Sequence, residues 1–102
     1  MNIVVNAVLE ADEETIAVLK QPILTMQEAS RAEDGCLDYT FSIELGDPEV
    51  IRITERWATM AALEAHFDTP HMAVFLKAMA ANPPKGSRIS VFEATEVPRP
   101  GS

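Results

Sequence analysis

Two histidines in the second half of the chain are the residues best suited to move a proton near neutral pH. His66 and His71 are the only histidines, and they stand five residues apart. Because a neutral imidazole can accept a proton at this pH, His66, which precedes Phe67 on a helix, could face a pocket and move a proton there. His71 falls in the first turn of a following helix, where a neutral ring is favoured. The simpler interpretation is that one or both histidines are capping or surface residues.

The spacing of the histidines gives no support to a metal site. On one continuous helix the two rings would point about 140° apart, at roughly 100° per residue. A zinc-binding pair on a helix instead requires positions i and i+4, which share one face. A helix restart at Thr69-Pro70 is the one feature that could bring the rings together. We therefore expect no metal site at these residues.

Two polar residues interrupt apolar patterns. Asn6 is the only polar side chain between Val4 and Val8. If it is buried, its amide must either bond to neighbouring backbone or point into a polar cavity. Glu55 shares a strand face with two isoleucines and Trp57, so its carboxyl group is either paired with an arginine or has a raised pKa.

The remaining reactive side chains have simple interpretations. Tyr39, Phe41, Phe75 and Trp57 fit an ordinary hydrophobic core. Cys36 is the only cysteine, which excludes an internal disulfide, and no base is adjacent to it in the sequence. The chain also lacks a glycine-rich phosphate loop and a G-x-S-x-G motif.

Periodicity and turn residues predict alternating strands and helices. Residues 2–9 form a β-branched strand that is apolar on both faces. Asp12 is the expected N-cap of a first helix, which Pro22 should kink or break and Gly35 should follow. The other expected elements are strands at 37–45 and 50–57 around a turn at 46–49, helices at 60–68 and 70–81, and a last strand at 88–97.

This order, β-α-β-β-α-β, predicts an α+β protein in which one helix layer packs on one face of an antiparallel sheet. The helices suffice for one face only, yet the first strand is apolar on both. We therefore expect a homodimer in which a second copy packs sheet against sheet.

Composition narrows the class of protein. The 102 residues suit one domain over residues 1–97, with a flexible tail at 98–102. The net charge of −8 and the scattered basic residues argue against nucleic-acid binding. No apolar run is long enough for a membrane span and the N-terminus does not resemble a signal peptide, so we expect no membrane association and a cytoplasmic location.

Several motifs along the chain occur together in one family. They are E-D-G-C-L-D-Y at 33–39, D-P at 47–48, E-R-W at 55–57, and L-E-A-H-F-D-T-P-H-M at 63–72. In this order and spacing they resemble the antibiotic-biosynthesis monooxygenase family, and in particular its small quinol monooxygenase branch. The resemblance implies a ferredoxin-like fold that dimerises into an α/β-barrel pair.

The resemblance also implies a reaction. A quinol or polyphenolic aromatic would be oxidised by O₂ in a cleft between helices and sheet, without metal, flavin or haem. His66 would be the base, and Asn6 and His71 would polarise the developing anion. The substrate would be bound by Trp57, Phe41, Phe75, Tyr39 and Glu55.

Two alternative functions remain open. One is the isomerisation of a small phosphorylated dione, for which Arg52, Arg56 and Arg88 could bind the phosphate. The other is a non-catalytic dimeric protein that holds an apolar ligand.

Overall fold

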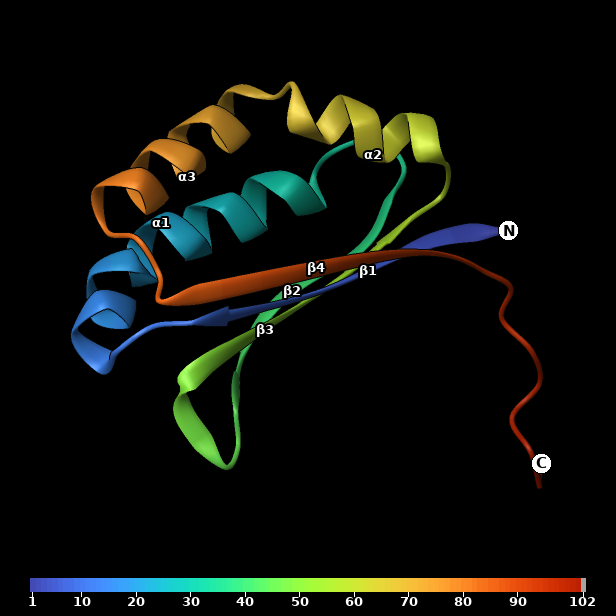
Figure 1. The fold of residues 1–102 in the computed structure, drawn as a ribbon. Coiled ribbons are helices and arrows are strands. Elements are labelled where there is room, and N and C mark those ends of the chain that lie inside the picture. The colour runs from blue at the N-terminus through green and yellow to red at the C-terminus, as the bar shows by residue number, and fades with distance from the viewer. Residues whose placement is uncertain (102) are drawn as a thin grey trace.

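The computed structural model describes residues 1–101 and orders their elements as β1–α1–β2–β3–α2–α3–β4 (Figure 1). The strands are β1 (Asn2–Glu10), β2 (Cys36–Glu44), β3 (Asp47–Trp57) and β4 (Gly86–Ala94). The helices are α1 (Glu13–Arg31), α2 (Met60–Phe67) and α3 (Pro70–Ala81).

The four strands form one antiparallel sheet in the order β2-β3-β1-β4. Its centre is the pair β1 and β3, in which Val5 lies opposite Glu55, while Val91 of β4 lies on the other side of Val5. All three helices lie on one face of this sheet (Figure 1). The predicted α+β, ferredoxin-like fold is therefore confirmed.

The core fills the space between the helices and this face. Alternate residues of β1 and β3 point into it, as the two-residue period of a strand requires, and α1 and α3 contribute one stripe each. The buried apolar residues are Ile3, Val5, Leu9, Leu19, Ile23, Met26, Tyr39, Ile51, Ile53, Trp57, Leu63, Met72 and Phe75.

Helix α1 begins where the sequence predicts and continues where a break was expected. The side chain of Asp12 accepts a hydrogen bond of 2.8 Å from the Thr15 amide, which makes it the predicted N-cap. The helix runs without interruption through Pro22, so of the predicted kink or break the break does not occur. Val18, four residues earlier, lies on the exposed side of the helix, where water can bond the carbonyl group that Pro22 leaves unpaired.

The hairpin of β2 and β3 differs from the prediction at both ends. Its turn is Leu45-Gly46 rather than 46–49, and β3 already begins at Asp47. A register shift between Cys36 and Asp38 leaves Leu37 as an extra residue that is about half exposed, so Cys36 lies opposite Trp57 instead. The strict alternation expected from Leu37 to Leu45 therefore holds only in the middle of the strand.

The second face of the sheet carries no helix (Figure 1). We call it the open face. It consists of the side chains that alternate with the core residues, and β1, β3 and β4 contribute Val4, Asn6, Val8, Arg52, Thr54, Arg56, Arg88, Ser90 and Phe92. Phe92 is 51% exposed there.

The C-terminal segment leaves the sheet earlier than predicted. Strand β4 ends at Ala94 rather than at residue 97, and residues 95–99 form neither helix nor strand. The predicted tail at 98–102 includes Ser102, which lies outside the described residues. No helix within residues 1–101 has both the length and the apolar character needed to cross a membrane.

Candidate functional site

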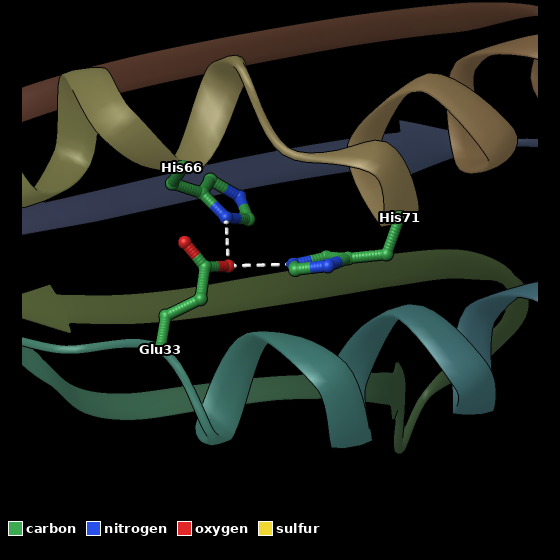
Figure 2. Close-up of side chains that lie close together, drawn as sticks. All are labelled: Glu33, His66 and His71. Atoms are coloured by element: carbon green, nitrogen blue, oxygen red, sulfur yellow. Dashed lines mark hydrogen bonds and ion pairs between the residues drawn. The ribbon is translucent and has the colours of Figure 1, made fainter.

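The two histidines meet at a single carboxylate oxygen (Figure 2). The Nδ1 atom of His66 lies 2.6 Å from Oε2 of Glu33, and the Nε2 atom of His71 lies 2.7 Å from the same oxygen. We refer to Glu33, His66 and His71 as the Glu33 cluster. Its members come from the corner after α1, from α2 and from α3.

The corner between α1 and β2 places Glu33 next to α2. Gly35 has a positive φ of 80°, which allows the chain to reverse directly after the helix. A Cβ atom at this position would lie 2.7 Å from the Cβ of Ala62 in α2, so only glycine permits the close approach. The carbonyl group of Gly35 also accepts a hydrogen bond of 2.8 Å from the Ala58 amide, just before α2.

The break between α2 and α3 brings the two rings to the same side. Helix α2 ends at Phe67, and α3 begins at Pro70 after the N-cap Thr69. The hydroxyl of Thr69 donates to the carbonyl oxygen of His66 at 2.8 Å and accepts from the Met72 amide at 3.3 Å. The predicted restart thus brings the rings of His66 and His71 together, whereas a continuous helix would point them apart.

The shared oxygen determines which ring nitrogens remain available. An ionised carboxylate accepts hydrogen bonds but donates none, so each imidazole donates from the nitrogen that faces Glu33. In a neutral ring, Nε2 of His66 and Nδ1 of His71 would then be the acceptor atoms. His66 is fully buried and its Nε2 has no hydrogen-bond partner within residues 1–101, whereas the His71 side chain is 21% exposed.

Aromatic side chains enclose the inner histidine. The ring centre of His66 lies 4.8 Å from that of Trp57 and 5.2 Å from that of Tyr39. Phe41 contacts Tyr39 with ring centres 5.7 Å apart, and Phe75 of α3 lies 5.8 Å from Phe41. The four aromatic residues predicted to bind the substrate therefore lie on the same side of the sheet as the histidines.

Glu55 is a buried carboxyl group close to this cluster. Its Oε1 accepts a hydrogen bond of 2.9 Å from the indole nitrogen of Trp57, and burial raises the pKa of Glu55 above its ordinary value. Burial also raises the pKa of Tyr39, and the nearby Glu55 adds to this effect. Of the two predicted alternatives for Glu55, the raised pKa is therefore confirmed; Arg52 instead pairs with Glu44.

A groove between α1 and α3 leads to the exposed end of the cluster. It has a volume of about 320 Å³, and its walls are mostly apolar. His71 and Phe75 line it from α3, and Pro22 and Met26 line it from α1. A flat apolar molecule in this groove would lie beside His71, whereas His66 does not border it.

Asn6 is not part of this arrangement. It is exposed on the open face, across the sheet from His66, so the structure does not bring the two together within one chain. There it borders a shallow hollow of about 450 Å³ with Arg52 and Arg88. Asn6 lacks the burial that its apolar neighbours suggested, because β1 is covered on one face only.

Glu33 is the functional candidate that the sequence interpretation missed. Local patterns place it only in the segment that ends the first helix. One signal pointed further, since Glu33 opens the E-D-G-C-L-D-Y motif on which the family resemblance rests. Within residues 1–101, only one group of histidine, cysteine, aspartate or glutamate side chains could together hold a metal ion, and it consists of Glu33, His66 and His71.

The helix layer on one face of an antiparallel sheet defines a ferredoxin-like class of fold. The model of the antibiotic biosynthesis monooxygenase family matches residues 2–78. The chain therefore belongs to the antibiotic biosynthesis monooxygenase family, and the resemblance seen in its motifs is confirmed.

Similar proteins are known from several bacteria. An uncharacterized protein from Synechocystis is 31% identical over 72 residues, which cover 71% of this chain and 49% of that protein, so the match spans about half the length of this relative. A crystal structure of a candidate antibiotic biosynthesis monooxygenase from Deinococcus radiodurans has a TM-score of 0.87 and 30% identity, covering 95% of this chain and 96% of the other. A second candidate, from Caulobacter crescentus, has a TM-score of 0.83 and 26% identity, covering 93% and 91%.

Proposed function

We propose that the chain is a monooxygenase that oxidises a quinol or another polyphenolic aromatic with O₂ and needs no cofactor. The observation that carries this proposal is the carboxylate-linked His71 at the edge of an apolar groove. The names given to the relatives from Deinococcus radiodurans and Caulobacter crescentus agree with an oxygenase.

The geometry favours His71 over the predicted His66 as the base that meets the substrate. Nδ1 of His71 is an acceptor in a partly exposed ring that borders the groove, while Nε2 of His66 is enclosed by aromatic residues. Glu33 would stabilise the imidazolium that forms when His71 takes a proton. His66 would hold Glu33 in place through its own hydrogen bond.

The substrate supplies the electrons for this reaction. His71 removes a phenolic proton, and the resulting phenolate passes one electron to O₂. The phenoxyl radical and superoxide then combine to form a C–O bond. Loss of the ring hydrogen as a proton and cleavage of the O–O bond release water. In total, a quinol and O₂ give a hydroxyquinone and H₂O, and the quinol loses four electrons.

Oxygen uptake by chelator-treated protein tests this proposal directly. We expect 1,4-dihydroxynaphthalene or hydroquinone to be consumed above its spontaneous rate, with one atom of ¹⁸O₂ appearing in the product. His71→Ala should lower the rate about 100-fold or more, the usual contribution of a general base. Glu64→Gln, an exposed change on α2, is the matched control and should leave the rate unchanged.

Three outcomes would overturn the proposal in different ways. An oxygen-uptake rate equal to the spontaneous rate would contradict the oxygenase function. Tight binding of the aromatic without turnover would support a non-catalytic binding protein. Proton exchange without O₂ consumption would support the isomerase, although Arg52 and Arg88 lie on the open face, away from the Glu33 cluster.

We further propose that the chain forms a homodimer through the open face. Val4 lies opposite Phe92 on this face, and Val8 follows beyond Asn6, so these apolar residues form a strip that Asn6 interrupts. No element of residues 1–101 covers this strip. A second copy would bury the strip and complete an α/β-barrel pair. Analytical ultracentrifugation at micromolar concentration should therefore give twice the chain mass of 11.2 kDa. A stable single chain would contradict the proposal.

A further inference from the structure

We propose that the Glu33 cluster is also a binding site for a divalent first-row transition metal ion such as Zn²⁺. One oxygen of Glu33 and one nitrogen from each of His66 and His71 all lie within 4.8 Å of one another. They come from three separate elements, and both ring nitrogens point toward the oxygen of Glu33 (Figure 2).

The set of donor atoms selects the kind of metal. Two imidazole nitrogens and one carboxylate oxygen suit zinc and neighbouring transition metals, whereas magnesium and calcium prefer oxygen ligands alone. Three protein ligands leave a fourth position for water, which is typical of reactive zinc sites rather than structural ones. The net charge of −8 further favours the approach of a cation.

A bound metal would require the three ligand atoms to rearrange around it. The ligand atoms of a tetrahedral zinc ion at about 2.0–2.2 Å lie roughly 3.3 Å apart. The two nitrogens, which lie up to 4.8 Å apart, would have to approach each other, and the oxygen of Glu33, now 2.6 Å and 2.7 Å from them, would have to withdraw by about 0.6 Å. Glu33 can do so because it lies in the corner after α1, while packing fixes the ring of His66.

Metal binding would change the tautomer of both histidines. The nitrogens that now donate to Glu33 must offer a lone pair to the metal, so their protons move to Nε2 of His66 and Nδ1 of His71. In this state His71 has no acceptor for a phenolic proton. If the proposed function holds, bound metal and substrate deprotonation therefore exclude each other, and the metal acts as an inhibitor.

Calorimetric titration of chelator-treated protein with zinc chloride alone tests the site. We expect one Zn²⁺ per chain and no heat of binding with Mg²⁺. His71→Ala and Glu33→Gln should each weaken Zn²⁺ binding by at least about tenfold, since loss of even an outer-sphere partner has that effect. Glu64→Gln, which changes an exposed carboxylate outside the cluster, should bind as the unchanged chain does.

Thermal unfolding separates loss of the site from loss of the fold. Zn²⁺ should raise the melting temperature of the unchanged chain but not that of His71→Ala, provided that the variant alone unfolds cooperatively. Equal Zn²⁺ affinity in the unchanged chain and in His71→Ala would overturn the site, as would the absence of binding.

The metal site and the proposed oxygenase can fail independently. Zinc is titrated without a substrate, so binding stands even where no quinol is oxidised. Conversely, oxygen uptake by metal-free protein stands even where zinc does not bind. If both hold, one equivalent of Zn²⁺ should abolish oxygen uptake, and uptake that persists in the zinc-saturated protein would overturn the inhibitory role.

Discussion

The two faces of the sheet contain similar strands but have opposite characters. On the helix-covered face, Glu55 and His66 are buried among aromatic rings, and His66 joins Glu33 and His71 in the Glu33 cluster. On the open face, Asn6 and Arg88 are exposed beside Val4 and Val8. Both faces arise from the same alternation of residues along β1 and β3.

The difference shows how burial turns ordinary polar residues into candidates for chemistry. A carboxylate beneath the helices has a raised pKa and specific partners, whereas Arg52 on the open face has only the exposed carboxylate of Glu44. Exposed ion pairs of this kind contribute little to stability or function. The helix layer, rather than the composition of the strands, therefore sets the location of the candidate site.

The largest expected contrast between the faces concerns stability. Trp57→Ala removes a fully buried indole and leaves a cavity, so it should lower the free energy of unfolding by about 3–5 kcal/mol. Phe92→Ala, the matched change on the open face, should cost about 0.5 kcal/mol or less in the single chain. Urea unfolding measures both. A large loss for Phe92→Ala that depends on protein concentration would instead show that the open face is buried between two copies.

A smaller effect is expected at the corner that positions Glu33. Gly35→Ala forces a side chain into a left-handed conformation and against Ala62, and should cost about 1–2 kcal/mol. Gly46→Ala in the hairpin turn is the control, because its Cβ would meet no atom within 4 Å. Urea unfolding of the two variants should separate them clearly. Equal stability of both would argue against the close approach of the corner to α2.

The smallest effect is a pH dependence that arises from Glu55. Because burial raises its pKa in the folded state, its protonated form stabilises the fold below the ordinary value of 4.5, and this contribution is lost as the pH rises through the raised value. Glu55→Gln keeps an acceptor for Trp57 but cannot ionise. As the pH rises from 4 to 7, the melting temperature of Glu55→Gln should therefore increase relative to that of the unchanged chain. Parallel curves over this range would contradict a raised pKa.

Local patterns were enough to predict most of the fold. The alternation in β1 and β3, the cap at Asp12 and the Thr69-Pro70 restart all lie where the sequence indicates, because each depends on residues close together along the chain. The errors at Leu37 and at the hairpin turn have another origin. A register shift depends on how two strands pair, and a single strand's pattern does not contain that information.

The sequence by itself determined that the chain has one face of helices, a pair of histidines beside a helix restart, and a buried glutamate on the third strand. Only the tertiary structure decided that Glu33 joins His66 and His71 while Asn6 lies across the sheet. The physical reason is distance along the chain. Glu33 precedes His66 by 33 residues, and the contact exists because Gly35 lets the α1–β2 corner pack against α2.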